Sequence, residues 1–281
     1  MSVIRVVGNY IHGQYGSTCN GAPIVGHLQA TNLLVADNII EIDAASSRGG
    51  CWGIDFDDGG YTTPVYLRNA KFSGNTIKNG GNVSLTVANC PDCVIENNLI
   101  KQNWAYGPGW SVTGILVPTK AARVGDDAST RNLVRNNTIW FGPNSTGGGT
   151  GIKVGFEGTG HVAANNTVYY SSISAGISGG VKCFDYPLEL GSYAFINNNH
   201  CYSAAPYSWG GTRSSLAAWQ ATGFDVASSA AIDPKFTAIG TNFTPVVGSR
   251  LIGAGNTANR SVFDITGKTR PSPPAIGAYE P

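Results

Sequence analysis

The feature that most constrains the fold is a short phrase that recurs along the chain, in which alternating apolar residues lead to asparagine and a second alternating pair. It reads VIRVVGNYI, LLVADNII, KFSGNTI, CVIENNLI, LVRNNTIW, HVAANNTVYY and AFINNNHCY. Its asparagine falls at Asn9, Asn38, Asn75, Asn98, Asn137, Asn166 and Asn198. The intervals, 23 to 39 residues, predict coils of one framework that carry loops of different length.

The repeat has a direct physical interpretation. Period-2 alternation buries every second side chain of a strand, and asparagine tolerates the left-handed backbone of a corner. Coils stacked ~4.8 Å apart would let the corner amides hydrogen-bond along the stack. A second phrase, a glycine followed by an inward isoleucine, begins another strand in each coil and occurs at Gly53, Gly114, Gly151 and Gly176. We therefore predict parallel strands that stack on their counterparts one repeat away.

Composition agrees with an all-β chain. Only 12% of the residues are charged, against ~25% in a typical soluble domain, and polarity comes instead from Asn, Ser, Thr and Gly. The net charge of +1 and the lack of a basic stripe argue against nucleic acid as a partner. No apolar run is long enough to cross a membrane, and the first residues do not read as an export signal.

At this point the sequence resembles the right-handed parallel β-helices of the pectin-lyase-like superfamily, with about seven coils over residues 1–205. Residues 206–281 look like the closing segment of such proteins, as parts of one domain. There, Ser214 to Gly223 predicts a short helix with a serine cap and glycine at the C′ position. The later phrases PVVGSRLIGAG, DITGKTR and IGAYE predict a tail that packs back along the helix and covers its end.

The first candidate site is GIDFDDG, at residues 53–59. If Ile54 and Phe56 point inward, Asp55 and Asp57 share the outer face about 7 Å apart, and Asp58 begins the turn. An ordinary Asp-Gly turn is the alternative interpretation. Asp55 lies within the strand, however, where a turn does not need it.

The phrase is similar to one in retaining β-helix xylosidases, roughly GIDLDDG. The resemblance implies that Asp55 is the nucleophile, that Asp57 and Asp58 line the site, and that a Glu on the next coil is the acid/base. That coil reads GNVSLTVANC and contains no Glu. Asp55 and Asp57 also suit the ~6.5–9.5 Å separation of an inverting pair. The polygalacturonase motifs are absent.

The second candidate site is GIKVGFEGTGH, at residues 151–161. Lys153, Glu157 and His161 would supply the base and acid of a polysaccharide lyase, or else would be ordinary charges at a solvated strand end. Lys153 lies about three coils from Asp55, or ~14 Å, so the two phrases line one groove rather than one catalytic pair.

Other residues suggest groove walls. Arg123, Asp126 and Asp127 belong to a long polar insertion, in which the two aspartates are a possible Ca²⁺ site, although no cofactor is required. The aromatic residues Trp52, Trp104, Tyr106 and Trp110 either stack on sugar rings or cover coil edges. The lone CxxC at Cys90 and Cys93 predicts a short disulfide or two buried thiols rather than zinc.

We expect a carbohydrate-active protein, a glycoside hydrolase or polysaccharide lyase that cleaves a glycan along the outer strand faces. The alternative is a non-catalytic glycan-binding or adhesion module, such as the shaft of a trimeric phage tailspike. Either would be extracellular or virion-associated and a monomer or homotrimer. The fold alone does not decide between them.

Overall fold

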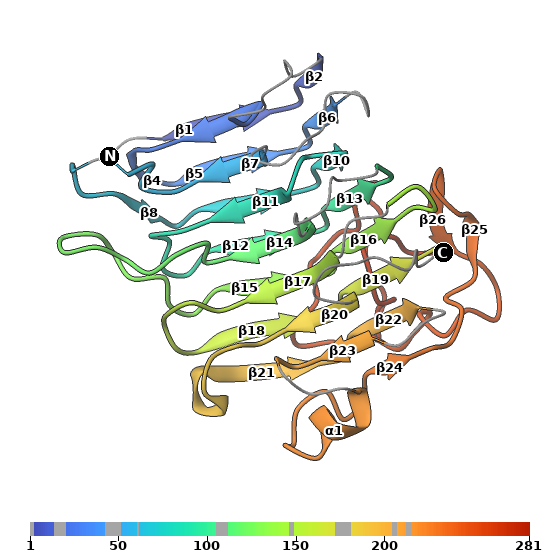
Figure 1. The fold of residues 1–281 in the computed structure, drawn as a ribbon. Coiled ribbons are helices and arrows are strands. Elements are labelled where there is room, and N and C mark those ends of the chain that lie inside the picture. The colour runs from blue at the N-terminus through green and yellow to red at the C-terminus, as the bar shows by residue number, and fades with distance from the viewer. Residues whose placement is uncertain are drawn as a thin grey trace.

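The computed structural model describes residues 3–13, 21–42, 52–60, 62–104, 112–145, 149–171, 181–203, 207–211 and 215–281. Within them the chain forms three long parallel sheets, as a parallel β-helix requires, so the predicted fold class is confirmed. Figure 1 shows the strands stacked from the N-terminal coil down to the helix α1.

Seven coils each contribute one strand to each sheet, and β24 adds an eighth strand to the second. The first sheet contains, in spatial order, β1 (Ile4–Val7), β5 (Leu33–Ala36), β9 (Lys71–Ser73), β12 (Val94–Glu96), β15 (Leu133–Arg135), β18 (His161–Ala164) and β21 (Tyr193–Asn197). The second contains β2 (Tyr10–Gly13), β6 (Ile39–Ile42), β10 (Thr76–Lys78), β13 (Leu99–Gln102), β16 (Thr138–Phe141), β19 (Thr167–Tyr170), β22 (His200–Ser203) and β24 (Ser229–Ala230).

The third sheet carries the glycine–isoleucine phrases. It contains β3 (Ile24–Gly26), β7 (Trp52–Phe56), β11 (Val83–Val87), β14 (Val112–Val117), β17 (Gly149–Val154), β20 (Val181–Asp185) and β23 (Tyr207–Trp209). Two small pairs complete the fold, parallel β4 (Gln29–Thr31) with β8 (Tyr66–Arg68) and antiparallel β25 (Phe236–Ala238) with β26 (Asn242–Pro245).

The core consists of columns of apolar side chains in register from coil to coil. In the third sheet Ile54, Leu85, Ile115, Ile152 and Phe184 align and are all fully buried. The glycine before each isoleucine has a packing reason. A Cβ at Gly151 would lie 2.5 Å from the carbonyl oxygen of Cys183 on the next coil. Gly176 lies outside the described residues.

The predicted asparagine ladder is present, with one correction. Side-chain amides bond in sequence through Asn9, Asn38, Asn75, Asn98, Asn137, Asn166 and Asn199, with Nδ2–Oδ1 distances of 2.8–3.1 Å. The last rung is therefore Asn199, not Asn198. The left-handed backbone belongs to the residue before each rung, such as Asn97 or Asn198. Turning the corner and bonding along the stack are thus tasks of two different residues.

The ladder ends on a buried carboxylate. Asn199 Nδ2 donates to Asp225 Oδ1 at 2.9 Å, and the indoles of Trp209 and Trp219 both donate to Asp225 Oδ2. Trp219 lies on α1 (Leu216–Gln220), and Ser215 caps that helix by accepting from Ala218 N. The serine cap was predicted. Gly223 lies one position beyond C′, since the C-cap is Ala221.

The tail packs back along the corners. Asn198 and Asn165 donate to the carbonyls of Ala254 and Asn256, and Asn97 donates to that of Phe263. The outer asparagine of each double-Asn corner therefore holds the tail. Figure 1 shows this C-terminal part, in orange and red, beside the stack rather than continuing it.

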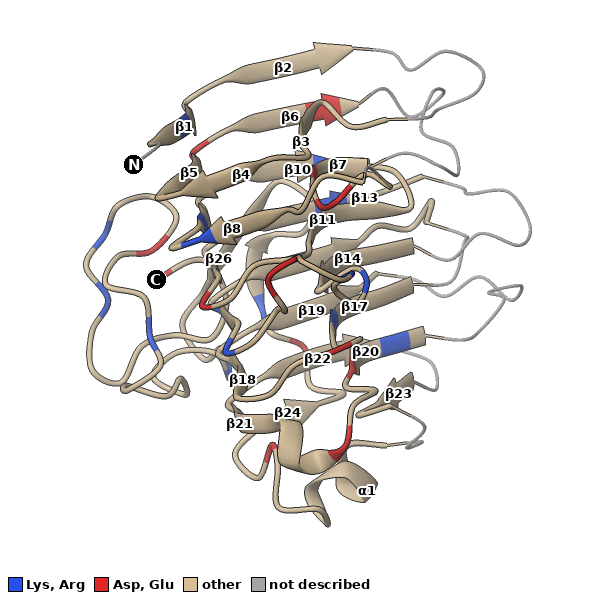
Figure 2. Cartoon of the chain, turned by 90° about the vertical axis from the view of Figure 1, so that its left-hand side faces the viewer, with Lys and Arg blue, Asp and Glu red and all other residues tan. Residues whose placement is uncertain are grey.

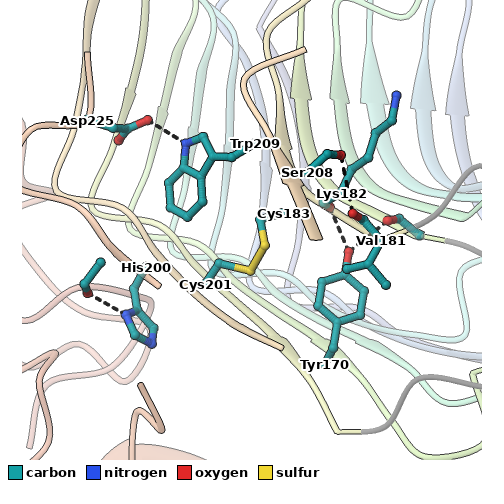
Figure 3. Close-up of a disulfide and its surroundings, with 11 residues drawn as sticks. Tyr170, Val181, Lys182, Cys183, His200, Cys201, Ser208, Trp209 and Asp225 are labelled. Carbon is teal, nitrogen blue, oxygen red and sulfur yellow. Dashed lines mark hydrogen bonds between the residues drawn. A yellow bond between two sulfur atoms is a disulfide. The ribbon is translucent and has the colours of Figure 1, made fainter. Parts of the chain in front are cut away.

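Two disulfides lie in the described part of the chain. Cys90 bonds Cys93, so the short-loop disulfide is confirmed, and Cys183 bonds Cys201 across the interior. Figure 3 shows the second disulfide between β20 and β22, with the Trp209–Asp225 hydrogen bond nearby. Cys19 and Cys51 lie outside the described residues.

Candidate functional site

The structure places Asp55 on the outer side of the third sheet. Its strand neighbours in register are Val25 and Thr86, while Ile54 and Phe56 are buried in the core, as predicted. Yet Asp55 and Asp57 expose only 8% and 9% of their surface. The two carboxylates therefore lie beneath other side chains instead of on an open groove face.

A small group of basic residues covers these carboxylates. Lys120 Nζ lies 2.8 Å from Asp57 Oδ2 and also forms an ion pair with Asp58. Arg123 Nε lies 2.9 Å from Asp58 Oδ2, and His27 Nδ1 lies 3.1 Å from Asp57 Oδ1. Asp57 and Asp58 thus sit among three basic side chains that come from two other coils.

Backbone bonds fix the same two carboxylates in a turn. Gly59 N donates to Asp57 Oδ1 at 2.6 Å, and Gly60 N donates to Asp58 Oδ1 at 2.9 Å. Both glycines have positive φ. The turn interpretation therefore applies to Asp57 as well as to Asp58, and Asp55 stands apart from it.

Asp55 is the electrostatically unusual residue. Its Oδ1 is buried without a hydrogen-bond partner among the described residues. Burial raises the pKa of Asp55 to about 7, and the charge of Asp57 adds to this, while His27 and Lys120 oppose it. Asp55 is thus a carboxyl group that holds its proton up to near neutral pH.

Asp58 behaves in the opposite way. Burial acts to raise the pKa of Asp58, but hydrogen bonds from Lys120 and Gly60 and the charges of Lys120 and Arg123 together lower it below the usual value. Neighbouring carboxyl groups with pKa values displaced in opposite directions are a common arrangement of acid–base sites, and structural ion-pair networks also produce it.

Glu157 fixes the position of the insertion that carries Lys120 and Arg123. Glu157 accepts from Ala122 N at 2.9 Å and from Ser129 N at 2.8 Å, one bond to each carboxylate oxygen. Glu157 was predicted as a lyase acid or base. In the structure its carboxylate fixes the segment that positions the basic residues.

The two insertion aspartates also make structural bonds. Asp126 accepts from Val65 N at 2.7 Å, and Asp127 forms a two-bond pair with Arg68. Among the described residues there is no group of three or more His, Cys, Asp and Glu that would hold a metal ion.

His161 contacts Glu157 through the backbone carbonyl rather than the carboxylate, and Lys153 pairs with Asp185. His161 is fully buried, its Nε2 lies 2.9 Å from the Glu157 carbonyl, and its Nδ1 accepts from Asn132 N at 3.4 Å. Burial lowers the pKa of His161, so the ring stays neutral around pH 7. Lys153 lies three strands from Asp55 in register, as the sequence predicts, and approaches Asp185 at 3.9 Å.

The predicted sugar-stacking residues have different positions. Trp52 is half-buried on β7, and Trp104 packs against the core, which favours the covering role for it. Tyr106 and Trp110 lie outside the described residues. An aromatic ring that sequence reasoning missed is that of Phe156, which is 49% exposed beneath the Lys153 ammonium at 4.7 Å.

Sequence reasoning also missed His27 and Lys120. A signal for His27 exists, because IVGH can be aligned with IDFD so that Ile24 pairs with Ile54 and Val25 with Asp55. His27 then falls opposite Asp57. Lys120 has no such signal, since it lies in an insertion beyond the last paired residue of β14.

A scan against protein-family models, a search of curated proteins and a search of solved structures each gave no match. The fold and the site therefore define the chain as a parallel β-helix protein with a buried carboxylate cluster on its third sheet. In the part of the chain that the structure describes, no helix is long and apolar enough to cross a membrane.

Proposed function

We propose that this protein is a carbohydrate-active enzyme that hydrolyses a polysaccharide, with Asp55 as the general acid. The observation that carries the proposal is the state of Asp55, which is nine-tenths buried, lacks a partner for one oxygen and has a pKa of about 7. A glycosidase acid must hold its proton at working pH, and a raised pKa provides this.

Asp57 is the proposed general base. Asp57 follows directly after β7, and two residues of extended chain separate its carboxyl group from that of Asp55 by ~7 Å, which falls within the range for inverting enzymes. The next coil places Thr86 in register with Asp55, so the Glu of the xylosidase pattern is replaced by a hydroxyl residue. This supports the inverting scheme over the retaining one.

The reaction balances with these two groups. Asp55 gives its proton to the glycosidic oxygen as the bond to the anomeric carbon breaks. Asp57 takes a proton from a water molecule, whose oxygen forms the new bond to that carbon with inverted configuration. Lys120 and His27 stabilise the negative charge of Asp57 before the proton arrives.

The test is a panel of polysaccharides assayed for new reducing ends, with Asp55→Asn as the probe variant. We expect the variant to lose activity by about a hundredfold or more, as the loss of a general acid predicts. Asp233→Asn is the matched control, because Asp233 is exposed in the C-terminal segment. Unchanged cleavage by Asp55→Asn would overturn the proposal, and new absorbance at about 235 nm would show elimination by a lyase instead.

One observation favours a second function, non-catalytic glycan binding. Asp57 and Asp58 already have ion-pair and backbone partners, as structural charges do. Glycan binding without any cleavage, equal in wild type and Asp55→Asn, would establish this function.

We also propose that the protein works outside the cell or on a virion surface. The two disulfides support an oxidising compartment. Sedimentation of the full chain would decide between the expected monomer and homotrimer.

A further inference from the structure

A cleft of about 680 Å³ lies on the third sheet, away from the Asp55 cluster. It is bounded by β20, β23 and the segment that leads to the 3-10 helix η2 (Leu190–Ser192), and its lining includes Lys182, Asp185, Leu188, Glu189 and Ser208. Figure 3 shows the Lys182 side chain extending away from the interior disulfide. The cleft thus opens on the outer side of the sheet.

Asp185 is the central polar group of this cleft. It is 5% exposed, and its Oδ2 lies 3.5 Å from Lys182 Nζ and 3.9 Å from Lys153 Nζ. Both distances exceed the roughly 2.7–3.2 Å of a usual hydrogen bond. The two ammonium groups therefore flank Asp185 at longer distances than the 2.8 Å between Lys120 Nζ and Asp57 Oδ2.

The charges around the cleft are balanced. Lys153 and Lys182 contribute two positive charges, and Asp185 and Glu189 contribute two negative ones. Figure 2 agrees, showing acidic and basic residues interspersed around this sheet rather than a single basic face. A ligand held here would be bound through hydroxyl groups rather than through charge, because a carboxylate accepts from them and an ammonium donates to them.

The cleft and the Asp55 cluster lie on one line. Asp55 pairs with Thr86, Thr86 with Leu116, Leu116 with Lys153, and Lys153 with Asp185. These four steps of ~4.8 Å separate Asp55 from Asp185 by ~19 Å. The exposed ring of Phe156, beside Lys153, lies near the cleft end of this line.

From this arrangement we infer that the Asp185 cleft is a second subsite, which binds an uncharged, linear glycan whose other part occupies the Asp55 cluster. The class of ligand rests on the proposed function. A chain of several sugars would run parallel to the helix axis, with hydroxyls on Asp185, Lys153 and Lys182 and a sugar face on Phe156. A polyuronate fits poorly, since its carboxylates would face Asp185 and Glu189.

The test is calorimetric titration of the full-length Asp55→Asn protein, which cleaves slowly if the proposed function is correct. The probes are cellohexaose, xylohexaose, chitohexaose and hexagalacturonate, each beside its disaccharide. We expect one neutral hexasaccharide to bind and its disaccharide to bind at least tenfold more weakly. Adding Asp185→Asn should weaken hexasaccharide binding about tenfold, as lost hydrogen bonds to a charged group predict.

Lys182→Gln and Asp233→Asn complete the design. Lys182→Gln keeps a polar, half-exposed side chain and should weaken binding in the same direction, which covers the case in which Asp185→Asn does not fold. Asp233→Asn should change nothing. Equal affinity for the two lengths, binding of hexagalacturonate alone, or affinity insensitive to Asp185 and Lys182 would each overturn the inference.

The same experiment keeps the two proposals apart. Hexasaccharide binding that depends on Asp185, in a protein that cleaves no glycan even with Asp55 intact, would refute the enzyme and leave the subsite standing. Cleavage that depends on Asp55 but is equally fast for di- and hexasaccharides would refute the subsite alone.

Discussion

Two buried polar groups of the molecule, the asparagine ladder at the corners and the carboxylates of the third sheet, differ in how far their hydrogen bonds are satisfied. Along the corner ladder, Asn98 Oδ1 accepts from both the side chain and the backbone of Asn75, and its Nδ2 donates to Asn137 and to the Phe72 carbonyl. At the third sheet, Asp55 is buried with an oxygen that has no partner among the described residues. One cluster is fully satisfied and the other is not.

The difference distinguishes polar residues that stabilise the fold from polar residues that serve a function. A buried amide costs little when all its hydrogen bonds are made, so the ladder can repeat in every coil. A buried carboxyl without its bonds reduces stability, and such positions concentrate at functional sites. On this comparison Asp55, rather than the more numerous asparagines, is where function is expected.

The largest effect is expected from breaking the ladder at its centre. Asn98→Ala removes four hydrogen bonds and leaves buried partners unpaired, so the free energy of unfolding should fall by about 3 kcal/mol or more. Urea unfolding measures it. The control is Asn9→Ala at the exposed end rung, which should cost about 1 kcal/mol or less. A central loss no larger than the terminal one would mean that the ladder does not stabilise the stack.

At Asp55 we expect a substitution to raise the free energy of unfolding rather than lower it. Its pKa is about 7 in the folded protein against 3.8 for the free side chain, so stability is unaffected below pH 4 and is lost as pH rises from 4 through 7. Asp55→Asn should therefore unfold like the wild type at pH 4 but be more stable at pH 8, by roughly 1–3 kcal/mol.

Thermal unfolding at the two pH values measures this difference. A variant that is less stable than the wild type at pH 8 would show that Asp55 is a satisfied structural residue, and the contrast with the ladder would disappear.

A smaller loss of stability is expected at Glu157, which supports the insertion that covers Asp57 and Asp58. Glu157→Gln replaces one acceptor oxygen with a donor that faces Ala122 N or Ser129 N, which should cost about 1–2 kcal/mol. Because Lys120 lowers the pKa of Asp55, a looser insertion should raise that pKa further. Carbon-13 NMR titration of the Asp55 carboxyl measures it.

Lys120→Met provides the comparison for that titration, since it removes the ammonium while Glu157 remains. It should raise the pKa of Asp55 as well. If Lys120→Met raises the pKa and Glu157→Gln does not, the insertion keeps its position without Glu157.

The smallest effect is expected at an outer asparagine. Asn198→Gly keeps a residue suited to positive φ but removes the bond to the Ala254 carbonyl, so it should cost about 1 kcal/mol and speed proteolysis of the tail. Asp37→Gly, at a corresponding exposed corner, should change stability by less than about 0.5 kcal/mol. Equal proteolysis of both variants would show that the outer asparagines do not hold the tail.

The sequence was sufficient to predict the coils because the same physics acts once in every repeat. Alternation predicts which residues face inward, and it correctly placed Ile54 and Phe56 in the core and Asp55 outside. The ladder was also predictable, except at Asn197 to Asn199, where three adjacent asparagines hide which one is the rung.

The surroundings of the site were not predictable in the same way. Lys120 reaches Asp57 from an insertion whose path depends on Glu157 and Asp126, so no local pattern reports it. Sequence reasoning took the charged residues at 123–127 and 153–161 as separate sites. In the folded chain, Arg123, Asp126 and Glu157 all belong to the structure that covers and supports the aspartates.

The hydrogen bonds of the C-terminal tail constrain the order in which parts of the fold can form. Neighbouring coils contact each other across a few tens of residues, yet Arg270 donates to Asn97 and Ser261 to both Asn97 and Asn136, across 125 to 173 residues. A chain made from its N-terminus can stack coils as they emerge. The bonds of Asn97 and Asn136 to the tail, however, can form only after Ser261 and Arg270 have been synthesised, so they form later than the coils that they hold.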